Sequence, residues 1–125
     1  MRSLLIAALA ALCGCSASAS ETSLASPYAP TFQCDVSVTP SRHGVRFEAS
    51  ALDHAGASGE YEFVIRKHDR AGDSNIVQAG EFELAPGERL VLGEAEFSLE
   101  RSGRYEARLE LRDDDVLMCS AEATR

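Results

Sequence analysis

The sequence predicts an all-β protein, an immunoglobulin-like β-sandwich of about seven strands. Beyond residue 31, nearly every segment alternates apolar and polar residues, which is the pattern of strands with one buried face. Turn residues recur between these segments, and no stretch shows a 3.6-residue period over helical length. The chain has 125 residues, which is enough for one such domain.

The N-terminal residues resemble an export signal. Arg2 precedes an apolar run at residues 4–12 that is too short to span a bilayer. The ASA sequence at residues 17–19 fits a small-x-small cleavage site and would release a soluble protein. The LCGC sequence at residues 12–15 resembles a lipobox, which would instead make Cys15 a lipid-bearing first residue. Both alternatives predict a periplasmic protein, with no membrane-spanning segment once the signal is removed.

We divide the chain into a signal at residues 1–19, a leader at residues 20–31 and a domain at residues 32–125. The leader is rich in Ser, Ala and Pro and has no periodicity, so we expect it to be flexible. The domain is the predicted immunoglobulin-like sandwich. Its strands are expected at residues 32–38, 45–49, 61–65, 76–84, 90–99, 105–111 and 116–121.

Prolines, glycines and polar runs predict the breaks between strands. Pro40 is expected to end the first strand, and residues 66–75 resemble a polar loop. Gly80 predicts a bulge or bend, and Gly93 is a candidate break in the fifth strand. Turns are expected at residues 86–87 (Pro-Gly) and 113–115 (Asp-Asp-Asp).

Tyr105 has two interpretations. It follows Gly103 at the start of the sixth predicted strand, where it fits a tyrosine corner whose hydroxyl bonds back across the preceding turn. It also fits an ordinary aromatic residue of the core.

Four cysteines are present, of which Cys13 and Cys15 lie in the predicted signal. The domain keeps Cys34 and Cys119, on its first and last predicted strands. In an exported protein such a pair predicts a disulfide, and a loop of this length would stabilise the fold by roughly 4 kcal/mol. Two reactive thiols are the alternative, but no Cys-x-x-Cys pair remains in the domain to lower a thiol pKa.

Composition and spacing exclude several functions. With a net charge of −8, the protein lacks the basic surface expected of a nucleic-acid-binding protein. The same charge argues against an anionic membrane surface as the main partner. His43, His54 and His68 show no metal-site spacing, and the aspartates show no EF-hand spacing. No nucleophile elbow or phosphate loop is present. We therefore expect no catalytic residue, metal or cofactor, and a protein that is not an enzyme.

One surface pattern favours binding. Outward positions of the sixth predicted strand alternate in charge, and the third predicted strand also points charges outward. If these strands are neighbours, as in immunoglobulin-like sheets, the charges line one face. The plainer interpretation is a solvated face with weak ion pairs. The functional interpretation is a surface that orients an extended polypeptide. The candidate client-binding residues are Glu62, Arg66, Arg104, Glu106, Arg108, Glu110 and Arg112.

Several short segments of the domain form a pattern shared with a known family. They are Tyr61-Glu62-Phe63, Lys67, GDSNI at residues 72–76, QAGEF at residues 78–82, PGE at residues 86–88, GRYEARL at residues 103–109 and Cys119. Together they resemble the CsgH branch of the curli-assembly chaperones, the CsgC/CsgH-like group. The resemblance covers about residues 32–119.

The resemblance implies a small periplasmic chaperone that keeps amyloidogenic curli-type subunits from forming fibres before export, without ATP, metal or enzyme chemistry. The CsgC branch carries a Cys-x-Cys pair in its folded domain, and this chain has none there, so no redox role is implied. Two other functions remain open: a structural or adhesive envelope module, with or without a lipid anchor, and a small thiol enzyme. We expect a monomer.

Overall fold

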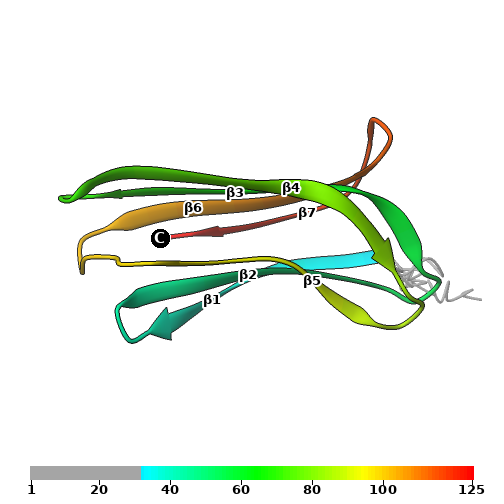
Figure 1. Cartoon of the computed structure of the whole chain (residues 1–125), viewed down its shortest axis with the longest axis horizontal. Helices are drawn as coiled ribbons and strands as arrows, with labels where there is room; N and C mark the ends of the chain where they lie inside the picture. The colour runs from blue at the N-terminus through cyan, green and yellow to red at the C-terminus, as the bar shows by residue number, and fades with distance from the viewer. Residues whose placement is uncertain (1–31) are drawn as a thin grey trace, which may run out of the picture.

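The seven strands form two antiparallel sheets packed face to face. The structure, a computed structural model, describes residues 32–125. One sheet has the strand order β1-β2-β5 and the other β4-β3-β6-β7, and Figure 1 shows them as two layers. The strands are β1 (Phe32–Ser41), β2 (Gly44–Asp53), β3 (Ala57–Asp69), β4 (Gly72–Leu84), β5 (Arg89–Phe97), β6 (Arg104–Asp113) and β7 (Val116–Thr124). The prediction of an all-β sandwich of about seven strands is confirmed.

The predicted signal, lipobox and leader at residues 1–31 lie outside the described residues. Within residues 32–125, the structure contains no helix of the length and apolar character needed to cross a membrane.

The core fills the space between the sheets with the inward side chains of both. Phe47 of β2 and Phe63 of β3 are fully buried, together with Ile65, Leu109 and Leu111. The ring of Phe47 lies edge-on to Tyr105, with centroids 4.9 Å apart, and so joins the two layers. Tyr105 therefore contributes an aromatic ring to the core, as the second of its two interpretations predicted.

The prediction of a polar loop at residues 66–75 is wrong. β3 and β4 form one continuous hairpin, closed by a two-residue turn between Asp69 and Gly72. Charges on both faces of this segment suggested a loop, but the inward charges neutralise each other, because Lys67 Nζ lies 2.9 Å from Asp69 Oδ2. The tight turn also keeps β4 beside β3, whereas the fourth strand of a constant-type immunoglobulin domain joins the other sheet.

Several smaller expectations need correction. Pro40 does not end β1, because an edge strand tolerates the missing N–H group. Gly80 causes no bulge: the β3–β4 register runs through it, and the Tyr61 ring lies 3.3 Å from where a Cβ would stand. β5 is continuous at Gly93, with a register shift opposite Ala49 and Ser50 instead of a break.

The predicted turns are confirmed. Residues 86–87 connect β4 to β5, with Gly87 at a φ of 75° and its N–H donating to Asp53 O at 2.8 Å. Asp114, at a φ of 49°, lies in the turn between β6 and β7. Aspartate tolerates this left-handed conformation better than most residues, which explains its place here.

A disulfide joins the two sheets along one side of the sandwich. Cys34 of β1 and Cys119 of β7 are bonded, with their Cα atoms 6.2 Å apart and 85 residues of separation. β1 and β7 pack along each other at this side, although they belong to different sheets. The predicted pairing is confirmed.

Candidate functional site

The seven predicted client-binding residues lie together on the outer face of the four-stranded sheet. β3 and β6 are paired neighbours, as the prediction required, and their outward positions face each other across the ladder. Glu62 lies opposite Glu110, Val64 opposite Arg108, and Arg66 opposite Glu106. We call this surface, made of the seven residues and Val64, the charged face.

A shallow hollow occupies the middle of the charged face. Its volume is about 220 Å³, and it is lined by Glu62, Val64, Arg66, Glu106, Arg108 and Glu110. Arg104 and Arg112 lie beyond its two ends along β6. Charges of both signs alternate over an open surface, which suits contact with an extended chain better than enclosure of a small molecule.

Two arginines of β6, Arg108 and Arg112, form ion pairs with neighbouring glutamates. Arg108 Nε lies 2.8 Å from Glu122 Oε1, and this hydrogen bond and charge raise the pKa of the Arg108 guanidinium above its ordinary value. Arg112 Nη2 lies 2.8 Å from Glu110 Oε2, and Arg108 Nη1 lies 3.7 Å from Glu110 Oε1. Arg108, Arg112 and Glu122 are about half exposed and Glu110 is 24% exposed, so solvent screens the pairs and they add little to stability.

Arg66 and Arg104 differ from the other arginines of the charged face. Within residues 32–125, neither has a carboxylate within 4.0 Å. Both lie toward the end of the sheet where β3 turns into β4, beside His68 and the C-terminal Arg125, around a hollow of about 600 Å³. They are therefore the arginines of this face most available to an incoming carboxylate or carbonyl group.

The opposite end of the same sheet is acidic, which the sequence analysis did not foresee. A hollow of about 740 Å³ gathers Glu60 of β3 and two glutamates of β4, Glu81 and Glu83, with the aspartates at residues 113–115. Glu60 lies opposite Glu81 of β4 and opposite Arg112 of β6. The acidic cluster depends on this register between strands, which the sequence does not show. The outer face is thus electrically polarised along its strands. Among the described residues, no group of three or more His, Cys, Asp or Glu side chains is arranged to hold a metal ion.

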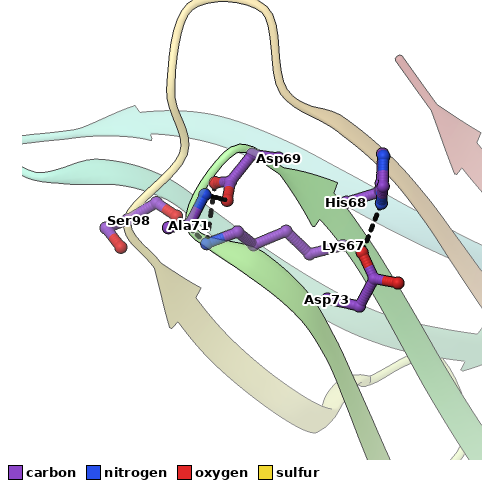
Figure 2. A network of polar contacts seen from close by, with 6 residues as sticks. All are labelled: Lys67, His68, Asp69, Ala71, Asp73 and Ser98. Carbon is purple, nitrogen blue, oxygen red and sulfur yellow. Dashed lines mark hydrogen bonds and ion pairs between the residues drawn. The ribbon is translucent and has the colours of Figure 1, made fainter.

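A buried ion pair fixes the end of the sheet where Arg66 and Arg104 lie, which we call the basic end, and the sequence did not predict this pair. Lys67 points inward from β3, is 8% exposed, and donates from Nζ to Ser98 O at 2.7 Å (Figure 2). Its partner Asp69 also accepts a hydrogen bond from the Ala71 N–H at 2.9 Å. The hydrogen bond from Lys67 is the main reason that the pKa of Asp69 lies below its ordinary value. The network ties the β3–β4 turn to the segment after β5.

His68 lies in β3, not in a loop as the sequence suggested. Its ring points to the outer face and its Nδ1 contacts Asp73 Oδ1 across the hairpin (Figure 2). Both side chains are 76% exposed, so this is a surface contact of the basic end.

Comparison with known proteins places the chain in a family. The model of the family described as "CsgH protein" matches residues 33–122, which is nearly the whole described domain. The chain belongs to the CsgH family. The resemblance to the CsgH branch of the CsgC/CsgH-like group is thereby confirmed. Among curated proteins, none matches the chain.

Two solved structures have folds similar to that of this chain. The solution structure of CsgH from R. palustris is 26% identical, with a TM-score of 0.60, over 73% of this chain and 89% of that one. The E. coli curli protein CsgC is similar in fold, with a TM-score of 0.62 at 10% identity, over 74% of this chain and 96% of that one. The sandwich of this chain therefore has the fold of both CsgH and CsgC.

Proposed function

We propose that this protein is a periplasmic chaperone that delays fibre formation by amyloidogenic, curli-type subunits through non-catalytic binding. The observation that carries the proposal is membership of the CsgH family, together with a charged outer face on the four-stranded sheet. The Cys34–Cys119 disulfide suits an oxidising compartment such as the periplasm. Whether the chain is released or held through Cys15 does not change this activity.

The chemistry of the charged face supports weak binding of early assemblies. Fibre growth adds strands whose backbone groups and side chains stack in register. A surface that binds a few transient nuclei can delay this process at low molar ratio, because it need not bind every monomer. Arg66 and Arg104, which have no ion-pair partner in the described domain, are the proposed contacts for acidic or carbonyl groups of the subunit.

A fibre-formation assay tests the proposal. The time course of a curli-type subunit is followed by thioflavin fluorescence, with the chaperone present at about one part in twenty. The wild-type protein should lengthen the lag phase, and the double variant Arg66→Glu/Arg104→Glu should shorten it back toward that of the subunit alone.

The matched control is Arg42→Glu/Arg101→Glu, which makes the same change in net charge at two exposed turn residues that, like Arg66 and Arg104, have no ion-pair partner among the described residues. It should delay fibres as the wild type does. An unchanged lag phase with wild-type protein would refute the chaperone proposal. Equal activity of both double variants would remove Arg66 and Arg104 as contacts.

A further inference from the structure

Every open sandwich has edge strands whose outer N–H and C=O groups lack a partner in the sheet. Such edges can template the pairing of another chain, and proteins usually protect them by covering, bulges, proline or charge. The four edge strands of the described domain are β1 and β5 in one sheet and β4 and β7 in the other. They differ sharply in protection.

Three of the four edges are protected. β1 and β7 pack along each other and are joined by the Cys34–Cys119 disulfide. β1 also carries Pro40, and β7 has a register shift opposite Leu111. β5 is shifted in register beside β2, and the Glu94 carbonyl at its edge accepts a hydrogen bond from Gln78 Nε2 at 2.8 Å.

β4 has none of these protections along its middle. Its 13 residues pair with β3 in one continuous register, without a bulge or a proline. The seven residues 74–80 (SNIVQAG) carry no charge, and Val77 at their centre is 56% exposed. Val77 lies beside Val64 on the outer face, so an apolar pair adjoins the edge. β4 is thus long, regular and uncharged where it faces solvent.

We propose that the free edge of β4 is where an extended segment of a client chain pairs, adding a strand to the four-stranded sheet. This inference rests on the proposed function, since the client is the amyloid subunit whose fibre formation is delayed. Alternate residues of β4 direct their backbone groups away from β3, and these groups would bond the added strand. Side chains of the added strand would continue the row that begins with Val77 and Val64.

The charges that flank the edge identify the occupant. Asp73 and Glu81 bracket the uncharged run, eight positions apart, which is about 26 Å along a strand. A fitting partner is uncharged over about seven residues and has basic or neutral residues at both ends. The Asp73 carboxylate already contacts His68, whereas Glu81 has no ion pair among the described residues.

The same charges disfavour a second copy of this chain. Antiparallel pairing of two β4 strands about Val77 would set Asp73 of each copy against Glu81 of the other. Parallel pairing in register would set each carboxylate against its equivalent. Like charges directly opposite are destabilising, and each chain also has a net charge of −8.

Pairing at β4 explains how one molecule could stop the growth of an assembly. Beyond the added strand the sheet continues through β4, β3 and β6 to β7, where β1 and the disulfide cover the edge. No further strand can add at that end. A growing client sheet that docks on β4 would therefore be capped on one side.

The test uses a defined peptide, capped at both termini, with seven alternating glutamine and valine residues between two lysines. Binding is measured by titration against the full domain with its disulfide intact. Val77→Lys on β4 should weaken binding at least tenfold, because it charges the edge and repels the lysines. Val91→Lys on β5 is the matched control, since Val91 is also an exposed valine on an edge strand, and it should bind as the wild type does.

A proline scan over residues 75–78 tests the backbone pairing itself. Amides of adjacent residues point in opposite directions, so the variants that keep the wild-type melting temperature are those whose lost amide faced outward. These variants should bind the peptide at least tenfold more weakly, which corresponds to about 1.4 kcal/mol and is the scale of one lost backbone hydrogen bond.

The outcomes separate this inference from the proposed function. If stable proline variants and Val77→Lys bind the peptide and delay fibres as the wild type does, the β4 edge is not the site, although the chaperone function stands. If wild-type protein binds the peptide at β4 but delays no fibres, the edge is confirmed and the function is lost. Sedimentation that shows a dimer broken by Val77→Lys would overturn the inference, because the edge would then serve a second copy.

Discussion

The two sides of the sandwich, where edge strands of the two sheets come together, are built differently: the β1–β7 side is closed, and the β4–β5 side is the open side. At the β1–β7 side the sheets pack along each other and a disulfide links them covalently. At the β4–β5 side the strands come together chiefly where Gln78 donates to the Glu94 carbonyl and lies over Gly93. The difference separates two tasks. The first side holds the layers together, so the second can leave a regular edge strand accessible without loss of the fold.

The largest effect on stability should follow from removing the disulfide at the β1–β7 side. Cys34→Ser/Cys119→Ser removes a cross-link over 85 residues, which should lower the free energy of unfolding by roughly 4 kcal/mol. Urea unfolding at equilibrium measures the loss. Wild-type protein with its disulfide reduced should match the variant, and a change under 1 kcal/mol in both would show that this side is held by packing alone.

A smaller but pH-dependent effect should come from the buried ion pair. Lys67→Met leaves the Asp69 carboxylate and the Ser98 carbonyl without their partner and should lower the melting temperature at pH 7. The conservative variant Lys67→Arg should recover part of the loss.

The pH profile identifies the cause. Because Lys67 holds the pKa of Asp69 below its ordinary value near 4, the pair stabilises the wild type above that pH. This stability is lost as the pH falls through the lowered pKa of the folded state. The gap between wild type and Lys67→Met should therefore narrow as the pH falls below about 4. A gap that stays constant with pH would mean that lost packing, not charge, explains the difference.

Gln78→Ala should have a modest effect, because it removes one side-chain hydrogen bond at the open side. The expected loss is about 1 kcal/mol in the free energy of unfolding. The comparison of the two sides depends on this value being well below that of the disulfide variant. A loss as large as the disulfide's would show that both sides hold the sheets equally.

The smallest effect is expected on the charged face. Arg108→Ala breaks exposed pairs with Glu122 and Glu110, and its unfolding curve should overlay that of the wild type at physiological salt. A clear loss of stability there would make the face structural and weaken its assignment to binding.

Strand alternation was enough to predict the sandwich, because seven segments each carry apolar residues on one phase. It failed at residues 66–75, where the inward phase holds Lys67 and Asp69 in place of apolar side chains. Nothing in the local sequence shows that these two charges pair inside the hairpin. Gly80 was misjudged for a related reason, since the residue that compensates for it, Tyr61, lies on the neighbouring strand.

The charged face was predictable because alternation within β6 and the pairing of β3 with β6 both follow from the strand pattern. The acidic end and the exposed edge of β4 were not. Both depend on register and on strand order, which decide that Glu81 faces Glu60 and that β4 has a neighbour on only one side. A single sequence carries little information on either.

Amide hydrogen exchange of the disulfide-bonded protein, with and without a curli-type subunit, tests most directly whether the open side receives a client. Outward-facing amides of β4 should become protected while the subunit remains soluble, and those of β7, covered by β1, should stay unchanged. Protection that appears on β7 or β5 instead, or nowhere at a concentration that delays fibres, would contradict this assignment.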